Sequence, residues 1–195
     1  MFRSFLLFTT ILSLLISFAT STFASDKKVH IKPCPAEAIL QMDSQFGYGT
    51  SNVTTCQQKR TNVKNAITWN SKQLNKTGVA QQARVTSNLI KNYENTYGMV
   101  FKEDYKMLVV AYGAGGRWLL NDEAYNRTFN VNTGNPTRLL AEQLIAKGIP
   151  LFMCQNTMRS NGWISSDLIP GTKMVPAGVA ALLDFQALGY HQIVP

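Results

Sequence analysis

Short apolar runs alternate with longer stretches of helical periodicity between Asn65 and the end of the chain. Runs rich in β-branched, aromatic and aliphatic residues predict five strands, at 66–69, 105–112, 149–153, 173–175 and 190–194. Apolar positions three or four residues apart predict helices over 78–97, 137–147 and 177–188, with shorter helical turns at 117–120 and 163–168. Residues 121–136 are polar and rich in turn formers, so they predict an irregular connection. Since strands that alternate with helices form right-handed crossovers, the pattern predicts an α/β fold with a mainly parallel, five-stranded sheet.

The apolar run at 149–153 stops abruptly at Cys154, and polar residues follow it. Open α/β sheets place their chemistry at the carboxyl ends of their strands, and Cys154 is expected at such an end. If the strand breaks into a turn there, the amides of residues 155–157 and the charge of Arg159 lower the pKa of the thiol. Cys154 is therefore the candidate catalytic residue, as a nucleophile or sulfur carrier. A buried, inert cysteine that packs as a small hydrophobe is the alternative, which position alone does not exclude.

A glycine-rich loop at 113–116 (Gly-Ala-Gly-Gly) follows the apolar run at 105–112 directly. Such loops can bring backbone amides close to a phosphate, but this one matches neither the dinucleotide-binding fingerprint nor the P-loop. We therefore favour a tight turn that needs small residues. If the two strands are parallel, this loop and Cys154 lie at the same sheet edge and form walls of one pocket. The residues expected to line that pocket are Tyr112, Gly113, Gly115, Gln155, Asn156, Thr157 and Trp163.

The first 25 residues predict a signal peptide rather than folded structure. Arg3 supplies the positive charge, residues 5–18 form an apolar segment too short to span a bilayer, and small residues at 21–24 predict cleavage near Ala24 or Ser25. We expect an exported protein, periplasmic in a Gram-negative bacterium and secreted otherwise, with no stable membrane insertion after cleavage. An uncleaved N-terminal anchor is the alternative.

Residues 26–62 predict an irregular N-terminal extension to the α/β domain at 63–195, because prolines and glycines interrupt any long period. The chain has three cysteines, an odd number for an oxidising compartment. The simplest pairing joins Cys34 to Cys56, a disulfide worth about 3 kcal/mol in the loop-entropy model. That pairing leaves Cys154 as the single free thiol. No metal site is predicted, since no Cys-x-x-Cys occurs and His30 and His191 lie far apart in the sequence.

The charge of the chain is basic but dispersed. Without the predicted signal peptide, which carries Arg3 and no acidic residue, 18 basic and 11 acidic residues leave a net charge of +7. Because the basic residues are not clustered, we expect a solvated basic surface and no nucleic-acid partner. The carboxylates Asp167, Asp184 and Glu142 are scattered, so a conventional hydrolase is not predicted. No motif predicts a cofactor.

Four segments of the C-terminal half resemble the DsrE/DsrF-like family in its exported, signal-peptide-bearing branch. They are 148–158 (Gly-Ile-Pro-Leu-Phe-Met-Cys-Gln-Asn-Thr-Met), 168–171 (Leu-Ile-Pro-Gly), 175–179 (Val-Pro-Ala-Gly-Val) and 186–190 (Gln-Ala-Leu-Gly-Tyr). The resemblance implies a flavodoxin-like three-layer sandwich that forms homo-oligomers, often trimers or hexamers. In the sulfur-relay members of the family, a cysteine carries sulfane sulfur as a persulfide between partner proteins. Cys154 matches a cysteine that is widespread in this branch.

Two functional hypotheses follow. In the first, the exported protein accepts or passes a sulfane sulfur through the Cys154 thiolate, with a sulfur-donor or sulfur-acceptor protein as its partner. In the second, the chain is a non-enzymatic ligand-binding or homo-oligomeric assembly domain in which Cys154 is structural. Whether the protein is an enzyme stays open between them.

Overall fold

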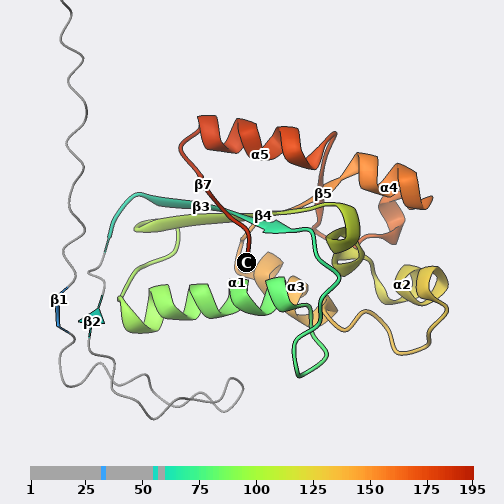
Figure 1. The fold of residues 1–195 in the computed structure, drawn as a ribbon, viewed down its shortest axis with the longest axis horizontal. Helices are drawn as coiled ribbons and strands as arrows, with labels where there is room; N and C mark the ends of the chain where they lie inside the picture. Colours follow the sequence, from blue (N-terminus) through green and yellow to red (C-terminus); the bar gives the residue numbers. More distant parts are fainter. Residues whose placement is uncertain (1–31, 34–54, 57–59) are drawn as a thin grey trace, which may run out of the picture.

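A five-stranded parallel sheet forms the centre of the fold (Figure 1). The computed structural model describes residues 32–33, 55–56 and 60–195. Every pairing in the sheet is parallel, and the strand order is β6-β5-β4-β3-β7. The strands are β3 (Val63–Trp69), β4 (Tyr105–Ala111), β5 (Leu151–Cys154), β6 (Lys173–Val175) and β7 (His191–Ile193). The predicted α/β fold and its five strands are confirmed.

Helices cover both faces of the sheet, which makes three layers (Figure 1). On one face lie α1 (Gln81–Lys91) and α3 (Arg138–Ala146), and on the other lies α5 (Gly178–Ala187). The face on which the helix of a right-handed crossover lies depends on the direction in which the chain crosses the sheet. From β3 to β6 the chain moves in one direction along the strand order, and from β6 to β7 it moves back, so α5 lies on the other face. The helix α1 continues as a π-helical turn, η1 (Asn92–Thr96). Together, α1 and η1 account for the single long helix predicted over 78–97.

The core divides between the two faces of the sheet because successive side chains on a strand point to opposite sides. The larger cluster, under α1 and α3, includes Ile67, Trp69, Met107, Val109, Leu151 and Met153. The smaller cluster, under α5, contains Ala66, Leu108, Val110 and Leu182. The middle strand β4 contributes to both clusters, which explains why its sequence is a nearly continuous apolar run.

Two helices differ from the predictions. Residues 121–136 were expected to be irregular, but they contain α2 (Asp122–Phe129). The Asn121 side chain accepts a hydrogen bond from the Ala124 N–H at 2.8 Å, and Asn130 ends the helix with a left-handed φ of 51°. No helix was predicted directly after Cys154, where the chain enters α4 (Gln155–Asn161). Both helices lie beyond the end of the sheet at which β5 ends (Figure 1).

The remaining short elements are connections. The glycine-rich loop belongs to a 3₁₀ helix, η2 (Gly113–Leu119), which is longer than the predicted turn at 117–120. A second 3₁₀ turn, η3 (Ser165–Asp167), lies within the turn predicted at 163–168. In the N-terminal region, β1 (Lys32–Pro33) pairs antiparallel with β2 (Thr55–Cys56).

Several predictions fall on residues outside those described. The predicted signal peptide at 1–25 and Cys34 lie there, so export and the disulfide between Cys34 and Cys56 stay predictions. The division between an extension at 26–62 and a domain at 63–195 likewise stays a prediction. Within the described part of the chain, no helix combines the length and apolar character needed to cross a membrane.

Candidate functional site

Cys154 is the last residue of β5 and immediately precedes α4. Its side chain is buried, with 4% of the residue surface exposed, and the thiol is free. The parallel pairing of β5 with β6 places Val175 beside Cys154. The chain then turns into α5, and the backbone N–H of Gly178 donates a hydrogen bond to the Cys154 Sγ at 3.2 Å. The sulfur is therefore held between the beginnings of two helices.

A second contact joins this position to the glycine-rich loop. Thr157, on the first turn of α4, is buried, and its Oγ1 accepts a hydrogen bond from the Gly113 N–H at 2.8 Å. Gly113 follows Tyr112 at the end of β4, the strand next to β5. The structure thus brings together the carboxyl ends of β4, β5 and β6, as parallel pairing requires.

The glycines of this region serve close packing. A Cβ on Gly115 would lie 2.3 Å from the backbone oxygen of Trp69, and one on Gly116 would lie 2.8 Å from the Thr157 methyl carbon. A Cβ on Gly178 would lie 2.9 Å from the Cβ of Tyr112. Side chains at these three positions would push β3, α4 and α5 away from the loop, so a packing role accounts for the glycines.

The environment of Cys154 favours its ionised form. Burial raises the pKa of the thiol, because a charged sulfur loses hydration. The N–H and hydroxyl of Thr157 and the N–H groups of Gly178 and Asn156 act in the opposite direction. Their combined effect is larger, and the pKa of Cys154 is lowered from its ordinary value. A thiol of lowered pKa supplies more of the nucleophilic thiolate at neutral pH.

The residues predicted to line a pocket do not all lie together. Thr157 and Gly113 are joined by a hydrogen bond, and Tyr112 packs against Gly178 beside the sulfur. Gln155 and Asn156 are exposed on the first turn of α4.

The other two predicted residues face different neighbours. Gly115 packs against the end of β3 at Trp69. Trp163 belongs to the larger core cluster, and its Nε1 donates a hydrogen bond to the Thr128 Oγ1 on α2 at 3.1 Å. These contacts direct Trp163 toward α2 and the core.

No sequence pattern indicates that Gly178 contacts Cys154, because 24 positions separate them. The contact depends on two facts that the sequence only suggests: β5 pairs with β6, and α5 begins three residues after Val175. A search for the helix that begins after the neighbouring parallel strand would have identified Gly178.

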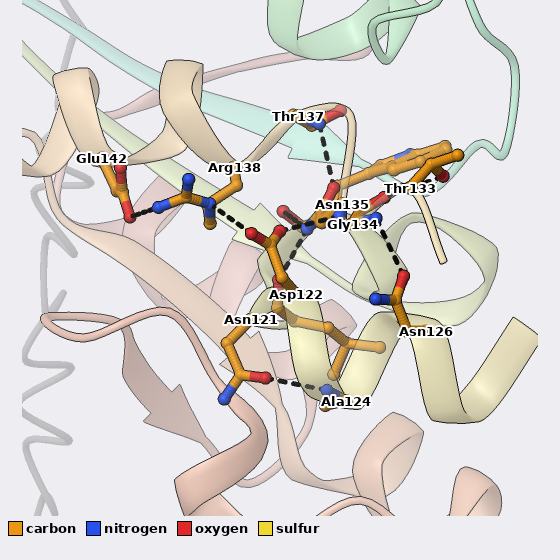
Figure 2. A network of polar contacts seen from close by, with 12 residues as sticks. Asn121, Asp122, Ala124, Asn126, Thr133, Gly134, Asn135, Thr137, Arg138 and Glu142 are labelled. Carbon is orange, nitrogen blue, oxygen red and sulfur yellow. Dashed lines mark hydrogen bonds and ion pairs between the residues drawn. The ribbon is translucent and has the colours of Figure 1, made fainter. Parts of the chain in front are cut away.

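A polar network fixes the far end of η2 (Figure 2). The buried side chain of Asn135 donates to the carbonyl oxygens of Trp118 at 3.1 Å and Leu120 at 2.6 Å. The side-chain oxygen of Asn135 accepts a hydrogen bond from the Thr137 N–H at 2.9 Å, and the backbone N–H of Asn135 donates to an Asp122 carboxylate oxygen at 2.8 Å. The 3₁₀ helix η2 is therefore held at its start by Thr157 and at its end by Asn135.

The carboxylates of this network are paired with a cation. Arg138 contacts an Asp122 oxygen and a Glu142 oxygen, each at 2.9 Å (Figure 2). Such neutralised carboxylates stabilise the connection between α2 and α3. Among residues 60–195, no group of three or more His, Cys, Asp or Glu side chains is arranged to hold a metal ion.

Comparisons with known proteins find one family model and similar solved structures. The model of the DsrE/DsrF-like family matches residues 71–195. Among solved structures, the protein of unknown function MTH1491 from Methanobacterium thermoautotrophicum is similar, with 21% identity and a TM-score of 0.53 over 69% of this chain and 100% of that chain. The ychN protein from E. coli is 17% identical, with a TM-score of 0.42 over 68% of this chain and 97% of that one. A search of curated proteins finds no match.

Proposed function

Because the chain belongs to the DsrE/DsrF-like family, which is associated with sulfur relay in general, we propose that it carries sulfane sulfur on the Cys154 thiolate. The observation that carries the proposal is the position of this thiol at the carboxyl end of β5, surrounded by donors that lower its pKa. Cys154 is the free thiol of the described region. A thiolate is the form of cysteine that attacks another sulfur.

The proposed reaction is a transfer of one sulfur atom between two thiols. The Cys154 thiolate attacks the outer sulfur of a donor persulfide, and a new S–S bond forms as the S–S bond of the donor breaks. The donor leaves as a thiolate, and Cys154 becomes the persulfide, with no net oxidation. Attack by an acceptor thiolate on the outer sulfur of Cys154 repeats the exchange and returns the Cys154 thiolate.

The surroundings of the sulfur match the charge that the reaction moves. The N–H of Gly178 stabilises negative charge on Sγ before attack and again when Sγ becomes the leaving group. Because only 4% of Cys154 is exposed, the donor must present a slender terminal sulfur. A persulfide terminus, with no substituent on its outer sulfur, satisfies that requirement.

We further propose that the protein is exported, as its N-terminal sequence predicts, and that it forms homo-oligomers. Support for an oligomer comes from α5, where Val179 and Leu183 expose 59% and 61% of their surfaces and Leu188 just beyond exposes 63%. Val179 and Leu183 lie on α5, and Leu188 follows its last residue, on the face of the sheet opposite α1 and α3 (Figure 1). A donor or acceptor protein for the sulfur atom is a further proposed partner.

Persulfide-selective labelling of the protein from its native cells tests the proposed function. Mass spectrometry of the peptide that contains Cys154 should find the added sulfur, and a Cys154→Ser variant expressed in the same cells should lack it. A Cys154 that stays unmodified in the cell and resists alkylation in the folded protein would contradict the proposal.

The alternative is a binding or assembly domain in which Cys154 packs as a small apolar residue. The deep burial of the side chain favours it, since buried cysteines are often inert. Under this alternative, Cys154→Ser leaves the cellular phenotype intact. A phenotype lost in a variant with unchanged folding excludes it.

A further inference from the structure

On the premise of the function proposed above, we infer that Tyr112 is a positioning residue, whose side chain packs against the start of α5 and holds the Gly178 N–H on the Cys154 sulfur. The role rests on two contacts of one residue, because Gly178 packs on Tyr112 and donates a hydrogen bond to Cys154.

Tyr112 lies beside Cys154 on the neighbouring strand. The pairing of β4 with β5 sets Ala111 beside Met153. Tyr112, the next residue, is extended, with φ −150° and ψ 169°, so it continues the strand and lies next to Cys154. Its side chain packs against the smaller core cluster, on the α5 face of the sheet. Val175 of β6 lies on the other side of Cys154, so Tyr112 and Val175 flank the thiol-bearing residue.

The start of α5 is packed tightly on the Tyr112 side chain. Gly178, the first residue of α5, is buried, and a Cβ at this position would lie 2.9 Å from the Tyr112 Cβ and 3.0 Å from its Cδ1. The N–H of the same glycine donates to the Cys154 Sγ at 3.2 Å. Removing the ring would leave a cavity into which the surrounding structure relaxes. The Tyr112 side chain therefore sets the position of the Gly178 N–H.

Tyr112 is itself anchored to the end of β3. Its backbone N–H donates to the Trp69 carbonyl at 2.9 Å, and its hydroxyl accepts from the Asn70 Nδ2 at 3.4 Å. The buried Gln82 of α1 fixes Asn70 in turn, because its Nε2 donates to the Asn70 Oδ1 at 3.0 Å and its Oε1 accepts from the Asn70 N–H at 2.7 Å. The hydroxyl contact is long for a hydrogen bond. Packing of the ring, more than the hydroxyl, therefore performs the positioning.

Charged side chains do not replace the Gly178 donor. The charged side chains on η2, α4, β6 and α5, the elements around the sulfur, are Arg117, Arg159, Lys173 and Asp184. The Arg159 guanidinium donates to the Asn156 Oδ1 at 2.6 Å, the Arg117 guanidinium lies 4.4 Å from the Phe129 ring centre, and the other two side chains are exposed. Burial raises the pKa of Cys154, and the groups that outweigh burial are neutral hydrogen-bond donors, the Gly178 N–H among them. Moving this N–H away from the sulfur therefore raises the pKa of the thiol.

The test compares Tyr112→Leu, which removes the ring, with Tyr112→Phe, which keeps the ring and removes only the hydroxyl. The measurement is the iodoacetamide alkylation rate of Cys154 against pH, followed on the Cys154 peptide. The midpoint of the profile is compared, because the plateau rate also depends on access to the sulfur. We expect Tyr112→Leu to raise the midpoint by about one pH unit, the effect of weakening one hydrogen bond to a charged group. Tyr112→Phe should keep the midpoint of the unchanged protein.

A midpoint that Tyr112→Leu leaves unchanged in a folded protein would overturn the inference. Equal shifts in the two variants would also overturn it, because the ring would then not be the cause.

NMR of the unchanged protein provides a second test that needs no substitution. The signals of the Gly178 N–H and of the Tyr112 ring protons should shift with one midpoint, that of Cys154 ionisation, since both groups lie against the sulfur-bearing residue. Ring signals that stay constant while the Gly178 signal shifts would contradict the inference.

The outcomes separate this inference from the proposed function. If the alkylation profiles behave as expected but no persulfide forms on Cys154, the sulfur-carrier proposal fails and the role of Tyr112 stands. If persulfide forms on Cys154 and its ionisation does not depend on the Tyr112 ring, the reverse holds.

Discussion

The backbone N–H of Gly178 lies 3.2 Å from the Sγ of Cys154, although 24 positions of sequence separate the two residues. Gly178 begins α5, the helix that follows β6, and β6 pairs with β5, the strand that ends at Cys154. The contact exists because Gly178 carries no side chain, which lets α5 begin directly against Tyr112. The ionisation of the thiol is therefore coupled to the packing of α5 on the end of β4.

Replacing Gly178 with alanine tests this coupling. The added Cβ would lie 2.9 Å from the Tyr112 Cβ, so α5 must shift and carry the N–H away from the sulfur. We expect a loss of about 1–3 kcal/mol in the free energy of unfolding, as for an overpacked core position. Alkylation of Cys154 at neutral pH should slow in the same variant. Asp184→Asn, further along α5 at an exposed polar position, is the control and should change neither measurement.

The pH dependence of stability gives a second prediction. The folded protein lowers the pKa of Cys154, so ionisation of this thiol adds stability. That contribution is fully present above the pKa of the unfolded thiol and is lost as the pH falls through the lower pKa of the folded one. Urea unfolding at a series of pH values should show it, and Cys154→Ala should lack it. Equal pH profiles for the two proteins would contradict the lowered pKa.

Asp167 provides a third prediction, away from the thiol. Its burial raises the pKa of the carboxyl, but the Ile164 N–H and the Arg127 guanidinium outweigh burial and hold the pKa below its usual value. Arg127 lies 2.6 Å from one carboxylate oxygen. We expect Asp167→Asn to cost about 1–3 kcal/mol in the free energy of unfolding, the range for hydrogen bonds to charged groups.

The Asp167 contribution has its own pH signature. Because the folded pKa is lowered, the stabilisation is present above the unfolded pKa and is lost as the pH falls through the folded pKa. Acid unfolding should be less steep in Asp167→Asn than in the unchanged protein. Asp184→Asn, at an exposed position, serves as the matched control, and an equal loss in both variants would rule out the ion pair as the cause.

Replacing Asn135 gives a fourth prediction, because its side chain joins the segment between α2 and α3 to the end of η2. Asn135→Ala leaves the buried carbonyl oxygens of Trp118 and Leu120 without this donor. We expect a loss of about 1–3 kcal/mol in stability, from the desolvation of unsatisfied groups. Hydrogen exchange at the Gly113 amide should accelerate as η2 loosens. Asn132→Ala, in the same connection but exposed, should leave both measurements unchanged.

The proposed oligomer is tested on α5. Leu183→Lys places a charge within the exposed apolar surface of α5, and we expect the molar mass from light scattering to fall toward that of one chain. Leu139→Lys is the control, because Leu139 is equally exposed, at 66%, but lies on α3 on the other face of the sheet. A molar mass of one chain for the unchanged protein would end the proposal.

The central strand could be predicted because a strand buried on both faces is apolar over nearly its whole length, as β4 is except at the exposed Lys106. The helix α2 was missed because its asparagines and charged residues also suit a loop. Its start signals were nevertheless present: Asn121 as the cap, followed by Asp122 and Glu123 in the first turn. The helix α4 carries little apolar periodicity, since only Thr157 and Met158 of its residues are buried.

For the site, the strand end at Cys154 and its proximity to the loop at Gly113 followed from parallel pairing. The glycines were interpreted as a tight turn that needs small residues. The structure shows them in the 3₁₀ helix η2, where Gly115 and Gly116 leave no room for a Cβ beside Trp69 and Thr157. The contact from Gly178 could not be predicted, because it depends on the register between β5 and β6. Local patterns of apolar and polar residues do not specify such a register.

The most direct test of the central claim is the intact mass of the purified, folded protein after brief exposure to inorganic polysulfide. We predict the addition of one sulfur atom, located on the Cys154 peptide, removed by a small acceptor thiol and absent from Cys154→Ser. A Cys154 peptide that gains no sulfur while the protein stays folded would contradict the account.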